Sequence, residues 1–102
     1  MKEKTKKAIR ELGIENLLID STPCGDGEYN VEVVIGRDLG EEKLLEAEKI
    51  AAPNKVGVYH IKIPQGEGNS MENVPVYGVR CCEEEIVSTA KKLDELRKQF
   101  LI

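Results

Sequence analysis

The sequence predicts an α+β fold: a two-layer sandwich with helices on one face of a four-stranded, mainly antiparallel sheet. Helical and strand-like periodicities alternate along the chain in the order α-ββα-ββα. The second half also repeats the first at an offset of 43 residues. With 102 residues, of which 40% are hydrophobic, the chain has room for one core. We therefore expect a single domain over residues 1–102.

The internal repeat aligns residues 25–50 with residues 68–93, and nine of the 26 aligned positions are identical. A fixed offset of this kind is typical of a structural unit that has been copied. Each copy has the pattern of two strands followed by a helix. We expect a helix over residues 2–12, a first ββα unit over residues 14–53 and a second over residues 55–100, the two units being related by a pseudo-twofold axis.

The chain begins with a helical pattern. Residues 2–12 place Ile9 and Leu12 on one side and mostly Lys or Glu on the other. Gly13 is suited to end this helix, because glycine accepts a left-handed backbone at low cost. The apolar run 17–19 then predicts a strand of about five residues. The Pro- and Gly-rich segment that follows it predicts a turn.

The first unit closes with a strand and a helix. Residues 29–35 alternate apolar and mostly polar side chains, the pattern of a half-buried antiparallel strand. Residues 41–52 have helical spacing, and Asp38, three places before Glu41, forms a variant of the capping box. Pro53 ends this helix.

The second unit has the same order. Residues 56–63 predict a third strand and residues 74–80 a fourth, joined by a ten-residue polar loop over 64–73. Pro75 indicates that the fourth strand lies at a sheet edge, or that its first part need not donate to a neighbour. Residues 83–100 have the longest helical pattern. Two hairpins are the simplest arrangement, although a single helix between the second and third strands also permits a crossover.

Charge and hydropathy argue against two classes of partner. The net charge of −4 works against binding to phosphate backbones. The basic stretch of residues 2–10 lacks the interleaved aromatic side chains of nucleic-acid-binding surfaces. No apolar run reaches the ~20 residues that a membrane span needs, and the first residues do not resemble a secretory signal. We expect no nucleic-acid partner and no membrane partner.

Composition also indicates where the protein resides and which chemistry it lacks. Without a signal-like or membrane-spanning stretch we expect a cytoplasmic location, and there the three cysteines, an odd number, are expected to be reduced thiols. Enrichment in Glu and Lys is a trend of heat-adapted proteins. The single histidine, His60, supports no Ser-His-Asp arrangement, and the C-x-x-C spacing of zinc sites is absent. We therefore expect no cofactor, no metal and no catalytic residue.

Cys81 and Cys82 adjoin the predicted start of the last helix, where main-chain N–H groups favour a thiolate. The carboxylates of residues 83–85 work against this effect. In the repeat, Cys81 takes the place of Asp38, which favours a capping or packing role for the pair. A thiol site that binds metal or exchanges electrons is the alternative.

Arg37 and Arg80 occupy equivalent positions in the repeat, each at the end of a strand and just before a helix. Under a pseudo-twofold axis, two guanidinium groups at one end of the sheet would hold a small anion such as a carboxylate or phosphate. The simpler alternative is that each arginine pairs with Glu41 or Glu84 in its own half.

These patterns favour a non-catalytic association module that binds itself, as a homodimer, or binds a protein partner. The support comes from strand edges that need cover and from the predicted loop after Pro64. The candidate contact residues in this loop are Glu67, Asn69 and Met71, and Met71 is an apolar side chain among polar ones. The thiol site and small-anion binding between the two arginines are the alternative functions.

Overall fold

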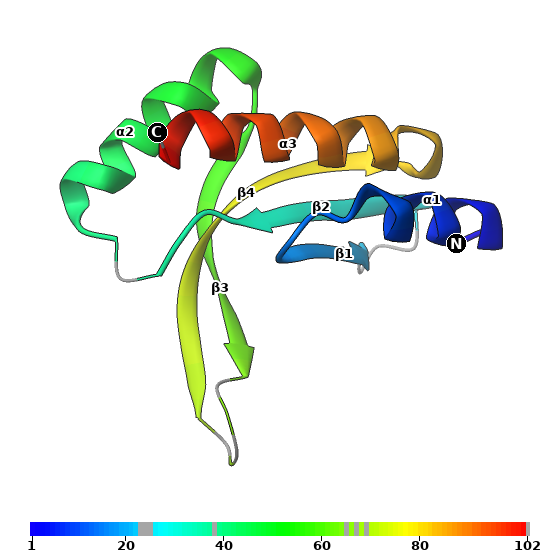
Figure 1. Cartoon of the computed structure of the whole chain (residues 1–102), viewed down its shortest axis with the longest axis horizontal. Helices are drawn as coiled ribbons and strands as arrows, with labels where there is room; N and C mark the ends of the chain where they lie inside the picture. The colour runs from blue at the N-terminus through cyan, green and yellow to red at the C-terminus, as the bar shows by residue number, and fades with distance from the viewer. Residues whose placement is uncertain (23–25, 38, 65, 67, 69, 102) are drawn as a thin grey trace.

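A computed structural model describes the chain apart from residues 23–25, 38, 65, 67, 69 and 102. It confirms the predicted two-layer α+β fold, with a four-stranded antiparallel sheet and helices against one face (Figure 1). The elements, in which η denotes a short 3₁₀ helix, are α1 (Glu3–Leu12), β1 (Leu17–Ser21), β2 (Glu28–Val34), α2 (Glu41–Ala51), η1 (Ala52–Asn54), β3 (Gly57–Pro64), β4 (Met71–Cys82), η2 (Glu83–Glu85) and α3 (Ile86–Leu101).

The strands lie in the order β1-β2-β4-β3, and each neighbouring pair is antiparallel. β1 with β2 and β3 with β4 form two hairpins, as predicted, and β2 and β4 join them in the centre. In Figure 1 the second hairpin extends well beyond the rest of the sheet.

β4 runs through the centre of the sheet, so the edge position predicted from Pro75 is wrong. The strand also begins earlier than predicted, because pairing with β3 starts at Met71. The other alternative from the sequence, that the first part of this strand need not donate to a neighbour, explains Pro75. The N–H of Ile35 donates to the Pro75 carbonyl (3.0 Å), and the return bond, which proline cannot donate, would fall beyond the end of β2 at Val34.

The structure does not confirm the internal repeat. Val33 of β2 belongs to the core beneath the helices, and its direct neighbour on β4 is Tyr77. Its equivalent at the 43-residue offset is Val76, one residue away, and successive strand residues point to opposite faces. A twofold axis perpendicular to the sheet would keep equivalent side chains on one face. The shared element order therefore does not extend to equivalent packing.

The core lies between the sheet and the helices. Tyr77 is fully buried there, and its hydroxyl donates to the Ala47 carbonyl of α2 (3.0 Å), so that the polar end of the ring has a partner. The other fully buried large side chains of this cluster are Val31, Val33, Ile35, Ile86 and Leu93.

The N-terminal helix is held to the rest of the fold at its start. It stops at Gly13, which has the left-handed backbone predicted for it (φ 62°). At its start, the Glu83 carboxylate accepts hydrogen bonds from the Lys2 N–H and the Thr5 hydroxyl, both at 3.0 Å. The predicted cap Asp38 lies outside the described residues. None of the helices described is both long and apolar enough to cross a bilayer.

Candidate functional site

Cys81 and Cys82 occupy different environments, because successive strand residues face opposite sides. Cys81 lies opposite Tyr29 in the buried core, where burial raises the pKa of its thiol. Cys82 is partly exposed and its Sγ donates to Oε1 of Glu85 (3.0 Å). This hydrogen bond raises the pKa of Cys82 to about 11. Both thiols are therefore protonated near pH 7, unlike reactive cysteines.

The described residues bring no third ligand to this pair. Within the described part of the chain, no group of three or more His, Cys, Asp or Glu side chains is arranged to hold a metal ion. Cys24 lies outside the described residues. The thiol alternative therefore receives no support from the geometry.

Arg37 and Arg80 lie far apart. Arg37 follows β2, and its Nη1 is 3.2 Å from a carboxylate oxygen of Glu72. The Nε of Arg80 is 3.7 Å from a carboxylate oxygen of Glu28. Glu72 and Arg80 are eight residues apart on β4, which corresponds to about 26 Å in an extended strand. The geometry therefore does not support one anion site made by both arginines, and each pairs with a glutamate of the opposite half.

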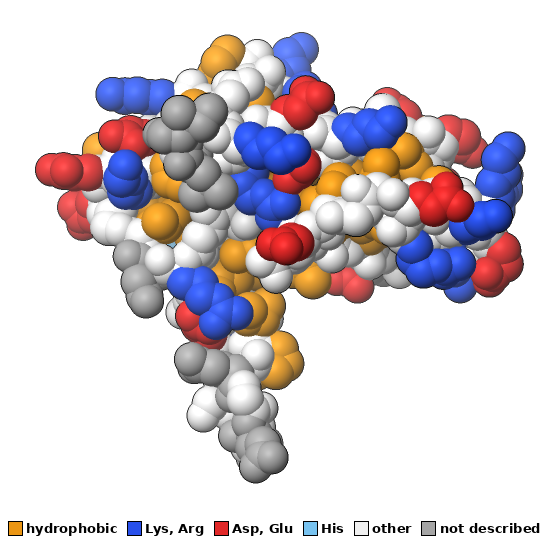
Figure 2. Space-filling view, viewed as in Figure 1, with side chains coloured by type: hydrophobic (Ala, Val, Ile, Leu, Met, Phe, Trp, Pro, Cys, Tyr) orange, Lys and Arg blue, Asp and Glu red, His pale blue; other side chains and the backbone are white. Residues whose placement is uncertain are grey.

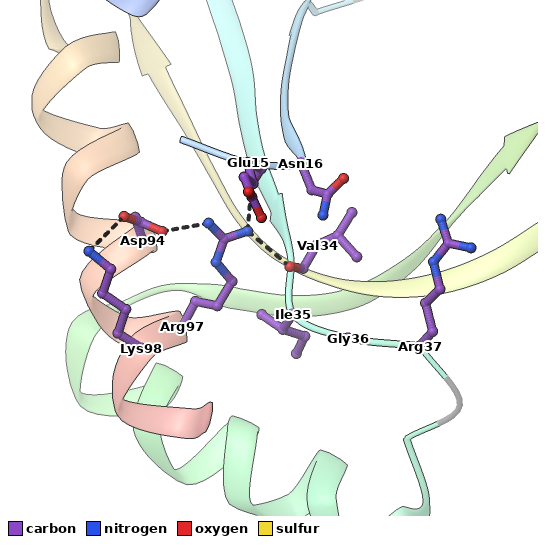
Figure 3. A pocket seen from close by; sticks show the side chains of 9 residues that line it. All are labelled: Glu15, Asn16, Val34, Ile35, Gly36, Arg37, Asp94, Arg97 and Lys98. Atoms are coloured by element: carbon purple, nitrogen blue, oxygen red, sulfur yellow. Dashed lines mark hydrogen bonds and ion pairs between the residues drawn. The ribbon is translucent and has the colours of Figure 1, made fainter. Parts of the chain in front are cut away.

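Each arginine borders a different cavity. The Arg97 cavity, of about 350 Å³, lies where α3, the end of β2 and the α1–β1 connection meet (Figure 3), and its lining residues are Glu15, Asn16, Val34, Ile35, Gly36, Arg37, Asp94, Arg97 and Lys98. The Lys55 cavity, of about 400 Å³, lies between η1, the end of β4 and the first half of α3, and its lining residues are Asn54, Lys55, Val79, Arg80, Cys81, Glu85, Ser88, Thr89 and Lys92.

In the Arg97 cavity, the guanidinium group of Arg97 is hydrogen-bonded to other parts of the protein. Arg97 is only 9% exposed, and its Nη1 donates to the main-chain carbonyls of Glu15 (2.7 Å) and Val34 (3.2 Å). Its Nη2 donates to Asp94, which also pairs with Lys98 (3.3 Å). Figure 3 shows the guanidinium group directed at all three of its partners. Arg97 therefore joins three elements and keeps few donors for a ligand.

The Asp94 carboxylate completes this network. Burial works to raise the pKa of Asp94, but hydrogen bonds from Arg97 and Lys98 outweigh it, and the pKa is lowered. The carboxylate is consequently ionised near pH 7 and neutralises part of the positive charge. The Arg97 cavity is a structural junction.

The Lys55 cavity leaves its cations more available. Lys55 has no ion pair with any described residue. Lys92 donates from Nζ to the main-chain carbonyl of Asn54 (3.0 Å), which is a neutral partner. Arg80 lines the cavity from β4, but its side chain lies on the opposite face of the sheet from Cys81, in a 3.7 Å pair with Glu28 that is about half exposed on both sides. Lys55 and Lys92 therefore leave the cavity with positive charge.

The β3–β4 hairpin carries exposed apolar side chains. Met71 is 55% exposed and Tyr59 is 39% exposed. The sequence predicted a loop position for Met71, but in the structure it is the first residue of β4. Glu67 and Asn69 lie outside the described residues. In Figure 2 hydrophobic side chains gather where this hairpin leaves the body of the molecule.

Tyr59 lies over the face of the sheet that the described helices leave uncovered. A Cβ added to Gly78 would come within 2.7 Å of its ring, so a glycine is needed beneath it. The Tyr59 hydroxyl donates to Glu32, a carboxylate only 9% exposed. Burial raises the pKa of Tyr59, and the hydrogen bond to Glu32 raises it further. The hydroxyl therefore stays protonated and holds the carboxylate in place.

Sequence reasoning identified Arg80 and Cys81 but missed Lys55, Lys92 and Arg97. For Arg97, the i,i+3 spacing from Asp94 is a signal of helical pairing, although nothing local marks its burial. For Lys55, the signal is a lysine just after a helix end, where glycine or asparagine is usual.

Comparison with known proteins found no match to this chain among protein-family models, curated proteins or solved structures.

Proposed function

We propose that this protein is a non-catalytic association module that accepts a further strand along the outer edge of β3, and that this strand belongs to a second copy of the chain. The supporting observation is the eight-residue edge strand β3, whose apolar side is turned away from the helices. A long strand with a free edge is a template for pairing. A cytoplasmic location remains part of this proposal.

The hydrogen-bond pattern leaves main-chain groups of β3 free on that edge. Residues of an antiparallel strand alternate between facing one neighbour and facing the other. The bond from Ile35 to Pro75 sets the alternation, so odd-numbered residues of β3 face β4. Val58, His60 and Lys62 therefore direct their N–H and C=O groups outward, where no described strand meets them.

Antiparallel pairing of β3 with its own copy around Ile61 places the apolar side chains of one copy beside those of the other. It places Tyr59 beside the partner's Ile63, and so doubles the apolar stripe on the uncovered face. On the other face His60 lies beside the partner's Lys62, so only one member of each pair carries a fixed charge. The product is an eight-stranded sheet with an isologous interface.

Sedimentation from micromolar to millimolar concentration tests this proposal. We expect the mass to rise from 11.4 kDa toward twice that value. His60→Pro removes an outward N–H and leaves the β3–β4 ladder intact. Because the dimer then loses two hydrogen bonds of about 1 kcal/mol each, we expect the dissociation constant to rise at least about tenfold.

The matched control is Lys43→Gln, at an exposed position on α2, which should leave association unchanged. Circular dichroism should show that His60→Pro keeps the native fold. A wild-type chain that remains at 11.4 kDa throughout would contradict the proposal. If His60→Pro associates as tightly as the wild type, the interface lies elsewhere and β3 is not the binding edge.

A further inference from the structure

Independently of the β3 edge, we propose that the Lys55 cavity binds a phosphate dianion, either free or as the terminal group of a small molecule. Two lysines border it, Lys55 after η1 and Lys92 on α3, and Arg80 of β4 contributes to its lining. The Arg80 side chain lies on the other face of the sheet from Cys81, where it pairs with Glu28. Glu85 is the one carboxylate among its described lining residues. Its positive charge stands out in a chain of net charge −4 and attracts an anion to this place. Its volume is in the range of small-molecule sites.

The nearby carboxylates of Glu85 and Glu28 do not neutralise the positive charge of Lys55 and Lys92. Glu85 accepts a hydrogen bond from the Cys82 thiol and has no ion pair with a lysine or arginine among the described residues. Glu28 reaches only Arg80, at 3.7 Å and with both side chains open to water. This pair lies on the face of the sheet away from α3, so it does not compete for Lys55 or Lys92.

Neutral donors surround the same space. The hydroxyls of Ser88 and Thr89 line the cavity. β3 begins at Gly57, opposite Gly78, so the end of β4 has no described strand on that side. The ladder alternation directs the main-chain N–H of Arg80 toward this open edge. A tetrahedral phosphate accepts from lysine, hydroxyl and main-chain donors at the same time, which suits this mixed set.

The backbone of Lys55 gives a further reason for a role of its side chain. Lys55 has a left-handed conformation (φ 57°, ψ 37°), which glycine and asparagine adopt more readily than lysine. Strain of this kind is often held at binding sites. Lysine at this position weakens the fold locally but supplies a charge to the cavity.

Titration of the ¹⁵N-labelled protein with inorganic phosphate, near pH 7.5 and at constant ionic strength, tests the proposal by NMR. We expect saturable shifts of the Arg80 and Thr89 amides, with a dissociation constant on the order of 1–10 mM. A parallel titration with glycerol 3-phosphate distinguishes the two sources. Tighter binding of the ester supports a phosphorylated small molecule, and tighter binding of inorganic phosphate supports the free ion.

Lys55→Gly and Lys92→Gln should each weaken phosphate binding about fivefold. Lys98→Gln, on the same helix but in the Arg97 cavity, is the matched control and should bind as the wild type does. Lys55→Gly also relieves the left-handed strain, so its loss of binding cannot be attributed to unfolding. The proposal fails if shifts do not saturate by about 50 mM, if both variants bind like the wild type, or if the shifts centre on Arg37.

Discussion

The Arg97 cavity and the Lys55 cavity border the two halves of one helix, α3, and both are lined by arginine and lysine. They differ in what holds these cations. Arg97 is buried and donates to two carbonyls and a carboxylate. Lys55 is exposed, and no described residue forms an ion pair with it.

This difference follows from the cost of desolvation. A buried guanidinium must have its donors satisfied by the protein, since water no longer reaches them. An exposed lysine has no such requirement and keeps its donors for a solute. The number of unused donors therefore separates a structural cluster from a candidate binding site, whereas the charge of the lining residues does not.

Arg97→Met should have the largest effect on this comparison. The variant removes the hydrogen bonds to the carbonyls of Glu15 and Val34. It also leaves the Asp94 carboxylate without its main partner. We expect the free energy of unfolding to fall by about 3 kcal/mol, measured by urea denaturation. Lys98→Met, whose side chain is 72% exposed, should cost under about 0.5 kcal/mol. Equal losses for the two variants would show that Arg97 is not the junction.

Asp94→Asn should have the next largest effect, and its cost should depend on pH. The pKa of Asp94 is lowered in the folded protein, so its carboxylate stabilises the fold above the ordinary carboxyl pKa, and this contribution is lost as pH falls through the lowered value. We expect a cost of about 2 kcal/mol at neutral pH, which shrinks below about pH 4. A cost that is the same at both pH values would contradict the assigned role.

Glu85→Gln tests whether the Glu85 carboxylate, which lines the Lys55 cavity, accepts a hydrogen bond from the Cys82 thiol. Without the carboxylate, the pKa of Cys82 should fall from about 11 toward its ordinary value. The thiolate fraction, and with it the rate of iodoacetamide labelling near pH 8, should rise at least about tenfold. The comparison uses a Cys24→Ser, Cys81→Ala background in both proteins. An unchanged rate would mean that Glu85 does not hold this thiol.

Lys55→Gly should give the smallest effect, a gain in stability. The left-handed backbone of Lys55 favours glycine, so the free energy of unfolding should rise by about 0.5–1 kcal/mol. Asn16 has the same conformation (φ 56°) in the Arg97 cavity, but asparagine tolerates it. Asn16→Gly should therefore change stability by only a few tenths of a kcal/mol. A loss of stability in Lys55→Gly would indicate that its side chain is needed by the fold.

The sequence predicted the elements well where the signal was local. Alternation in β2 and helical spacing in α3 depend on neighbouring residues, and both elements lie where they were expected. The predicted edge position of Pro75 was wrong because the end of β2, a distant feature, makes proline harmless there. The alternation of β3 separated an apolar side from a more polar one, but it does not tell which side meets the helices.

The candidate site was predicted in part for the same reason. Arg80 and Cys81 are neighbours in the chain, and both line the Lys55 cavity. Lys55 and Lys92 reach that cavity from η1 and α3, and no spacing rule connects residues so far apart. Arg37 was grouped with Arg80 through the repeat, and the sheet places the two at opposite ends of β4.

By itself, the sequence determined the order of helices and strands and the helix stop at Gly13, because each depends on short-range periodicity or on the backbone of one residue. It left a crossover open beside the two hairpins, and the structure has the hairpins. The tertiary structure decided that β4 is central, that Tyr59 faces away from the helices and that Arg97 is buried with its donors bound to other parts of the protein. These outcomes depend on strand register, in which one residue changes the face, and on hydrogen bonds such as that from Arg97 to Glu15, which joins residues 82 positions apart.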